Sequence, residues 1–458
     1  MASICARLDR IKDDPTGLFD SHAIERACRE HQHHWRNRTL NPLSTLAAFA
    51  IQVMHRNTAL SYVARLMSTR GKVFSASAYC QARARLPVAV VRAAFEDFTT
   101  RARGGRASSD GLWCGHRTAL IDGTGVSTPD TPELRAAFGV SSNCKDGAGL
   151  PLIHTLTIFD AHDGLLLDLH TSPAHTHDLR HAHDLHPALT PGDVLVGDRG
   201  FASYIHLHRL TTLKCHGVMR ISASWKIPFP ARSGERTRHT YNRHRRHEPI
   251  LIELHDADDQ TIEIVKPHNR PDHVTPEEFA QIPATMTVRA VRYTVENKGV
   301  RTRQVTLLST LLDAKKYPAK ALADLYETRW RIEVNLRHLK RTMDADRLRC
   351  QSVDGVQREL LMFALIYNAV CSVRAGAARV AQVAPTRLSF VDALRVMLIA
   401  SQDGPAMPTS PPTLMLVPSR PPRVHPRQLK RAHSNFKVMD RSRTTLVDWM
   451  NKKCEVAN

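Results

Sequence analysis

Apolar residues recur with a helical period through the first part of the chain, residues 1–110. In segments 40–57 and 59–70 they stand three and four positions apart, which is the spacing of a helix with one buried face. A third helix is predicted within 73–87, where a serine can cap its start and a proline ends it. Two short helices around Gly71 are typical of a helix-turn-helix and equally of any small helical bundle. Contact between this helical domain and the ends of a DNA partner is therefore one of two expectations.

Short apolar runs that end in turns, the pattern of strands, replace the helical period across residues 111–221. Segment 117–125 is predicted as a strand that ends in an acid and a glycine turn, and segment 150–172 as two strands joined by a tight turn. A helical segment, a strand that ends at Asp198, a helix and a last strand follow in that order. Strands that alternate with helices late in the order predict an α/β layer fold.

Residues 222–312 interrupt this alternation with a basic loop and four β-rich runs, so we expect a mostly β insertion. Helical periodicity resumes in residues 313–403, where one of the predicted helices is strongly apolar. Residues 404–458 are rich first in proline and then in Lys and Arg, and they cannot bury a core of their own. We expect this basic tail either to follow a DNA backbone or to be a solvated, disordered tail.

The chain is strongly basic, which narrows the class of its partner. Of its 458 residues, 64 are Lys or Arg and 44 are Asp or Glu, which gives a formal net charge of +20. This excess predicts a polyanionic partner, most simply nucleic acid, with a generally basic proteome as the competing explanation. The nine cysteines form no C-x-x-C pair, which argues against a zinc ribbon or a disulfide framework and fits a reducing cytoplasm. The best apolar run, residues 360–370, is too short to cross a membrane, so no membrane partner is expected.

One helical segment concentrates much of the chemistry. An aromatic ring, a guanidinium, a carboxylate and an ammonium share one stripe of a predicted continuous α-helix. They belong to Tyr326, Arg329, Glu333 and Lys340. The neighbouring stripe is apolar and can dock on a core. A carboxylate flanked by cations and an aromatic suits a metal ion held against a nucleic-acid strand. Arg–Glu pairs four residues apart also occur as plain solvated stabilisers of a helix.

Two further acids follow predicted strands. Asp122 and Asp198 each stand at or just after the C-terminal end of a strand, where ligand clefts form in open α/β sheets. Neighbouring strands would bring both carboxylates to one sheet edge, where Glu333 can join them from its helix. Three acids suit two Mg²⁺ ions, which activate a water or a 3′-hydroxyl and stabilise the leaving oxygen of a phosphodiester. Taken alone, each Asp is equally well explained as an ordinary turn residue.

These motifs resemble those of the DDE-type transposases of bacterial insertion sequences that carry a Y-x-x-R-x-x-x-E-x-x-x-x-x-x-K signature. IDGT at 121–124 is similar to the first-aspartate motif of that family, and GDRGF at 197–201 to the second. Segment 326–340 matches the third motif without a gap, and the resemblance extends over about residues 110–400. It implies a ribonuclease H-like catalytic core in two parts, on either side of the β insertion.

The resemblance also implies an activity and its partners. The activity is cut-and-paste transposition of the protein's own insertion sequence, by DNA strand cleavage and 3′-hydroxyl strand transfer with two Mg²⁺ ions, for which Mn²⁺ can substitute. The partner is double-stranded DNA, as terminal inverted repeats and as target, held by a homodimer in a synaptic complex. The expected place is the bacterial cytoplasm, at the nucleoid. Two rivals are a domesticated metal-dependent nuclease and a non-catalytic, transposase-derived DNA-binding regulator.

Carried over residue by residue, the resemblance assigns metal binding and catalysis to Asp122, Asp198 and Glu333. It assigns DNA contact near the cut to Tyr326, Arg329 and Lys340. Assisting contacts are expected from Trp330, Arg337 and Arg220. Some relatives stack a flipped base on a tryptophan late in the β insertion, and segment 303–311 has no aromatic residue. The aromatic residues that could replace it are Trp225, Tyr241 and Tyr293, so the hairpin step stays open.

Overall fold

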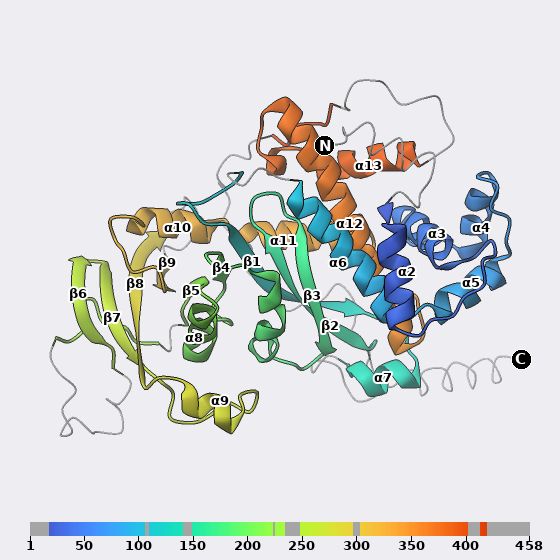
Figure 1. Cartoon of the computed structure of the whole chain (residues 1–458). Coiled ribbons are helices and arrows are strands. Elements are labelled where there is room, and N and C mark those ends of the chain that lie inside the picture. The colour runs from blue at the N-terminus through green and yellow to red at the C-terminus, as the bar shows by residue number, and fades with distance from the viewer. Residues whose placement is uncertain are drawn as a thin grey trace, which may run out of the picture.

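A mixed sheet of nine strands runs through the described part of the chain, in the order β3-β2-β1-β4-β5-β9-β8-β7-β6 (Figure 1). The computed structural model describes residues 18–105, 110–140, 149–222, 225–233, 248–295, 303–401 and 413–418. The pairs β1–β4 and β4–β5 are parallel, and all other neighbouring pairs are antiparallel. With helices on both sides of the strands in the sequence, this confirms the predicted α/β class.

The strands occupy the segments where alternating or short apolar runs predict them. In the first half of the sheet they are β1 Thr118–Ser127, β2 Leu152–Asp160, β3 Leu166–Pro173, β4 Val194–Gly197 and β5 His216–Arg220. In the second half they are β6 Ile250–Asp256, β7 Asp259–Val265, β8 Thr285–Val295 and β9 Arg303–Ser309. Because β5 pairs directly with β9, the second group of strands extends the same sheet and does not form a separate one.

Helices α2 to α6 precede the sheet and lie at the opposite end of the molecule from β6 to β8 (Figure 1). Their bounds are α2 Ser21–Glu30, α3 Pro42–Met54, α4 Leu60–Ser68, α5 Ala76–Arg85 and α6 Val88–Gly104. Helix α3 is apolar on all sides and almost wholly buried, as its sequence requires. Asn41 caps it by accepting a hydrogen bond from the Ser44 N–H (2.9 Å). Ser75 caps α5 in the same way, and Gly71, at φ +71°, turns the chain between α4 and α5.

Shorter helices lie between the strands. They are α7 Pro132–Phe138, η2 Asp178–Arg180, η3 Ala182–Ala188, α8 Tyr204–Thr212 and α9 Pro276–Gln281. The predicted helical segment after β3 is thus two 3₁₀ helices, η2 and η3, with Pro187 inside the second. Helix η3 packs against β2, β3 and α8, and η2 packs against η3.

The helices after the sheet are α10 Ala319–Glu327, α11 Trp330–Arg337, the π-helix η5 His338–Thr342, α12 Val353–Ala381, η6 Pro385–Arg387 and α13 Phe390–Ala400. Helix α12 packs against α3, α6 and α13. It is longer than the predicted apolar run, and by length and composition it could cross a membrane. However, 89% of its most apolar window is buried inside the described structure, which is the environment of a core helix.

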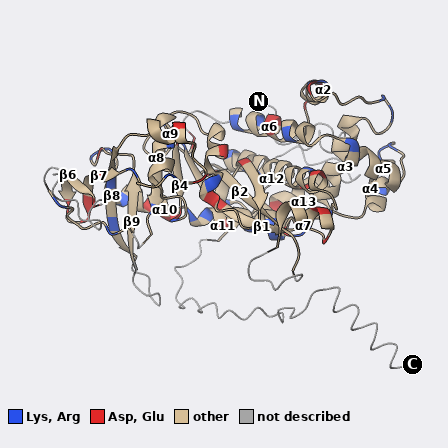
Figure 2. Cartoon of the chain, turned by 90° about the horizontal axis from the view of Figure 1, so that it is seen from below, with Lys and Arg blue, Asp and Glu red and all other residues tan. Residues whose placement is uncertain are grey.

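A buried carboxylate ties the N-terminal helices to this core. Glu359 on α12 is fully buried and accepts hydrogen bonds from the side-chain amide of Asn57 and from the backbone N–H groups of Arg349 and Cys350. Lys and Arg are spread along the described chain from β8 and β9 at one end to α5 at the other (Figure 2). Most of the predicted basic loop after β5, including Tyr241, and most of the 404–458 tail lie outside the described residues.

Candidate metal-dependent active site

Parallel pairing brings the two predicted aspartates next to each other. Asp198 directly follows β4, and β4 lies beside β1, which carries Asp122. The prediction that Asp122 ends its strand is wrong, because β1 continues to Ser127. The parallel pairing ends at Leu120, opposite Val196, while the antiparallel pairing with β2 continues and keeps the rest of β1 extended. Asp122 therefore stands just beyond the last parallel pair, level with the start of the Asp198 turn.

The predicted single helix from Tyr326 to Lys340 is also wrong. Helix α10 ends at Glu327, α11 begins at Trp330, and Lys340 lies on the π-helix η5. Between α10 and α11 the backbone tightens, since the N–H groups of Thr328 and Arg329 bond carbonyls only three residues back. The Thr328 hydroxyl also donates to the carbonyl of Leu325 (2.7 Å), a local side-chain bond that competes with α-helical pairing.

Arg329 stands at this break and faces two of the predicted acids. Its Nη1 lies 3.4 Å from Oδ2 of Asp122, and its Nη2 lies 3.5 Å from Oε1 of Glu333. The Arg329 and Asp122 side chains are 20% and 23% exposed, whereas Glu333 is 52% exposed. One guanidinium thus joins a carboxylate of the sheet to a carboxylate of α11 at the molecular surface. A ligand could reach both.

Burial raises the pKa of Asp122 to about 6. The Gly123 N–H, which donates to Asp122 Oδ1 (2.9 Å), and the Arg329 guanidinium oppose this shift, while the negative charges of Asp198 and Asp178 add to it. Asp198 in turn accepts a hydrogen bond from the Gly200 N–H (2.7 Å). A divalent cation would offset the neighbouring negative charges that disfavour ionisation of Asp122, and carboxylate oxygens are donors that suit such a cation.

The predicted DNA-contacting residues differ in their surroundings. Tyr326 is 8% exposed, and burial raises its pKa, with Arg329, Arg220 and Asp198 as its charged neighbours. Lys340 donates to the Thr124 hydroxyl (3.0 Å) and the Gly125 carbonyl (2.5 Å), so it fastens η5 to β1 just past Asp122.

Burial lowers the pKa of the Lys340 ammonium, in spite of the nearby Asp346 carboxylate. Trp330 is 57% exposed and Arg337 is exposed as well, on the outer side of α11. The structure therefore places Arg329 and Lys340 against β1 and Tyr326 near Arg329 and Asp198, and it leaves Trp330 and Arg337 at the surface.

Two further residues near Asp122, His154 and Asp178, are not indicated by any motif in the sequence. The His154 Nε2 and the Asp178 Oδ1 are 2.5 Å apart, and both side chains lie against Gly123 so closely that a Cβ at that position would clash with them. His154 lies on β2 and Asp178 opens η2. The only signal in the sequence was the histidine-rich segment after β3, whose period predicts a helix but no contact with β1.

A family model described as a transposase DDE domain matches residues 113–369, a segment that contains all three acids and all nine strands of the described sheet. The chain belongs to the DDE transposase family. It is also 28% identical over 296 residues to the transposase InsG of insertion sequence element IS4 from Escherichia coli K12, a match that covers 64% of this chain and 60% of that protein. The resemblance to insertion-sequence transposases is thereby confirmed.

Among solved structures, the chain is similar to a piggyBac transposase synaptic complex with hairpin DNA. The TM-score is 0.43 and the sequence identity 11%, over 87% of this chain and 82% of that one.

Proposed function

We propose that this transposase moves an insertion sequence by a cut-and-paste reaction in which Asp122, Asp198 and Glu333 hold two Mg²⁺ ions, with Mn²⁺ as a substitute. The observation that carries the proposal is the position of Arg329, which contacts Asp122 and Glu333 at once while Asp198 adds its charge to the same site. Carboxylates from β1, from the turn after β4 and from α11 supply the oxygen ligands that Mg²⁺ prefers. When bound, the ions would polarise a water or 3′-hydroxyl and the phosphodiester that it attacks.

The protein's own residues position the DNA in this proposal. The Arg329 guanidinium lies beside the Asp122 and Glu333 carboxylates. Once metal ions bind those carboxylates, the guanidinium would be free to pair with a phosphate of the DNA held at the same place. Tyr326 and Arg220 lie near that guanidinium and would contact the strand end. Lys340 holds η5 against β1, and its ammonium lies beside Gly125, three residues after Asp122. Trp330 and Arg337 offer an exposed ring and an exposed cation for the flanking duplex.

The fold supports a ribonuclease H-like core for this chemistry. Its basis is the order β3-β2-β1-β4-β5, in which three antiparallel strands precede two parallel ones. We propose residues 111–221 and 313–403 as its two parts, 222–312 as the β insertion, and 1–110 as a DNA-end-binding domain. The partners would be terminal inverted repeats and target DNA, bound by a homodimer in the bacterial cytoplasm.

A cleavage assay tests the proposal. Purified protein is incubated with duplex DNA that carries the element's end, in Mg²⁺, Mn²⁺ or Ca²⁺, and the new 3′ ends are mapped. Cleavage at the element boundary in Mg²⁺ and Mn²⁺, lost in Asp198→Asn and kept in Glu327→Gln, supports it. Glu327 is an exposed acid at the end of α10 and serves as the matched control. Boundary-specific DNA binding without cleavage in either ion would instead identify a regulator, and cleavage with no preference for the boundary would identify a nuclease.

A further inference from the structure

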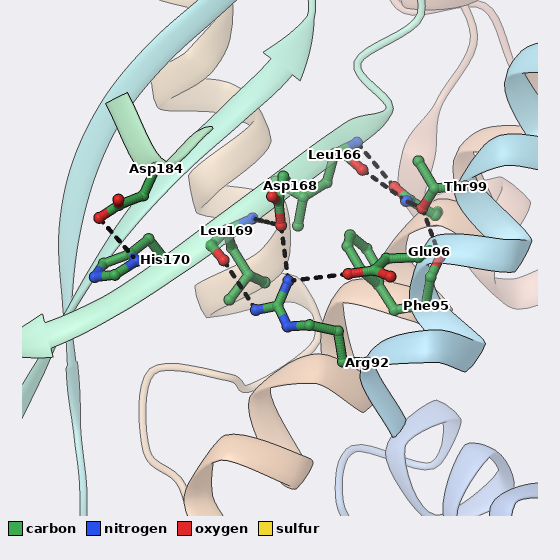
Figure 3. Close-up of polar contacts among 10 residues, drawn as sticks. Arg92, Phe95, Glu96, Thr99, Leu166, Asp168, Leu169, His170 and Asp184 are labelled. Atoms are coloured by element: carbon green, nitrogen blue, oxygen red, sulfur yellow. Dashed lines mark hydrogen bonds and ion pairs between the residues drawn. The ribbon is translucent and has the colours of Figure 1, made fainter. Parts of the chain in front are cut away.

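Three imidazoles surround one carboxylate at the β3 edge of the sheet, away from the three acids proposed for catalysis. Asp184 Oδ2 lies 2.7 Å from Nδ1 of His181 and 3.5 Å from Nδ1 of His170, and its other oxygen lies 3.3 Å from Nε2 of His183. His170 belongs to β3, whereas the other residues lie between and within η2 and η3. Figure 3 shows Asp184 directed at His170 from the segment that crosses above β3.

The geometry of the rings is unusual for a simple ion pair. His170 and His181 are stacked, with ring centroids 4.2 Å apart and ring planes within 18° of each other. Two imidazolium cations would repel each other in this position, so at most one ring can carry a charge beside Asp184. In addition, Nδ1 of His183 is buried and has no hydrogen-bond partner among the described residues. The cluster therefore holds more nitrogen donors than one carboxylate needs.

Burial disfavours the charged form of two of these histidines. Burial and then the charge of His181 lower the pKa of His170, and burial followed by the charge of Arg209 lowers that of His183. Burial of Asp184 works against its charge, but the hydrogen bond from His181 helps to hold the pKa of that carboxyl below its ordinary value. Neutral imidazole nitrogens and ionised carboxylates are the forms that bind a metal ion.

We propose that His170, His181 and Asp184 form a binding site for a transition-metal ion, with Zn²⁺ as the ion of best fit and His183 as the nearest additional ligand. One ligand atom from each of the three residues lies within 4.8 Å of the others. Around a tetrahedral zinc ion with bonds of about 2.0–2.1 Å the ligand atoms stand roughly 3.4 Å apart, so modest side-chain rotations close the site. Imidazole nitrogens select zinc and its neighbours over Mg²⁺, unlike the all-oxygen acids near Arg329.

The surroundings give such an ion a structural role. Arg92 of α6 pairs with Asp168 (2.9 Å) and donates to the Leu169 carbonyl (3.1 Å), which fixes β3 immediately before His170 (Figure 3). On the other side, His181 lies three residues after Asp178, the residue that packs on Gly123 beside Asp122. A metal bound here would fasten the 3₁₀ segment to the sheet edge and hold Asp178 and His154 in place beside Asp122.

Metal analysis of the full, untagged chain tests this site. After dialysis against buffer with excess Mg²⁺, elemental analysis is expected to find about one zinc ion per chain that a zinc-selective chelator removes. Substituted Co²⁺ is expected to give visible d–d absorption typical of tetrahedral nitrogen and oxygen ligands. Glu333→Gln is expected to retain this zinc, because the proposed catalytic acids are not its ligands.

Two ligand variants and one control make the result decisive. His181→Gln and His170→Gln should each weaken zinc binding by at least about tenfold, while His175→Gln, an exposed histidine of the same loop, should not. Circular dichroism of each variant establishes that it is folded, and His170→Gln stands in if His181→Gln does not fold. Absence of zinc from the wild type with no binding on titration, or equal binding by folded ligand variants, would overturn the site. Loss of zinc in Glu333→Gln would assign the ion to the catalytic acids.

Discussion

Replacing Asp259 by Ala should destabilise the protein strongly, because it leaves a buried guanidinium without its partner. Asp259 on β7 and Arg289 on β8 form a bidentate salt bridge: Nε of Arg289 donates to Oδ1 of Asp259 (2.7 Å), and Nη2 donates to Oδ2. Arg289 has no exposed surface, and the Asp259 side chain is 8% exposed. The third guanidinium nitrogen donates to the Tyr317 carbonyl (2.5 Å), just before α10 begins. The pair therefore connects the second half of the sheet to the helices that carry Tyr326 and Arg329.

The expected loss is about 3–5 kcal/mol of unfolding free energy, the range for removing one partner of a buried ion pair. The neighbouring residue provides the control: Asp258 pairs with Arg292 but is 55% exposed, so Asp258→Ala should cost less than about 1 kcal/mol. The double variant Asp259→Ala, Arg289→Met removes the stranded charge and should recover much of the loss.

Urea unfolding followed by tryptophan fluorescence and circular dichroism measures the three variants against the wild type. The comparison is between midpoints and slopes from the same preparation, so that a shift at constant slope reports stability alone. Equal midpoints for Asp259→Ala and Asp258→Ala would contradict the expected cost of leaving Arg289 buried without its partner. So would a double variant that is less stable than Asp259→Ala alone.

Two further predictions follow from the site and the core. Tyr326→Phe should keep boundary cleavage within about tenfold of the wild type, because the hydroxyl positions DNA and does not attack it; abolished cleavage together with a trapped phosphotyrosine in the wild type would show a covalent mechanism instead. Burial lowers the pKa of His186 to about 3 and of His206 to about 4, with their Nε2 atoms 3.1 Å apart. Both pKa values lie below the value of about 6.5 in the unfolded chain, so the unfolded chain binds more protons than the folded one as the pH falls. Above pH ~6.5 the two rings therefore do not lower the free energy of unfolding. At pH 5 each ring should lower it by on the order of 2 kcal/mol. Urea unfolding midpoints at pH 7.5 and pH 5 measure this loss. The difference between the two midpoints should be smaller in the double variant His186→Leu, His206→Leu than in the wild type, and an equal difference would show that other groups cause it.

The general architecture could be predicted because its signals are local. Strand periods and turn residues mark each of the nine strands, and the apolar surface of α3 and α12 marks the helices of the core. Sequence alone could not show that β5 pairs with β9. The two strands are far apart in the sequence, and the backbone hydrogen bonds that join them do not depend on which side chains are present. The single continuous sheet is therefore a result of the structure.

At the site, the sequence placed the acids on the right elements but misjudged their local backbone. Asp122 lies within β1 because β2 pairs along the whole of that strand, an effect that periodicity does not contain. Helix α10 stops before Arg329, although the apolar spacing continues, because local bonds of Thr328 tighten the turn. Asp178 and His154 escaped notice since only the three-dimensional structure brings η2 against Gly123.

In the proposed mechanism, excision of the element from its own flanking DNA depends on metal binding by Glu333, and an excision assay measures this dependence. The native gene with its flanking DNA is supplied with wild-type protein, Glu333→Gln or the control Glu327→Gln, and the rejoined donor site is quantified by sequencing across it. We predict excision at the element's boundaries by wild type and Glu327→Gln, with a loss of at least about a thousandfold in Glu333→Gln, whose carboxylate would be a metal ligand. Excision by Glu333→Gln at the wild-type level would show that the Glu333 carboxylate is not needed for the reaction.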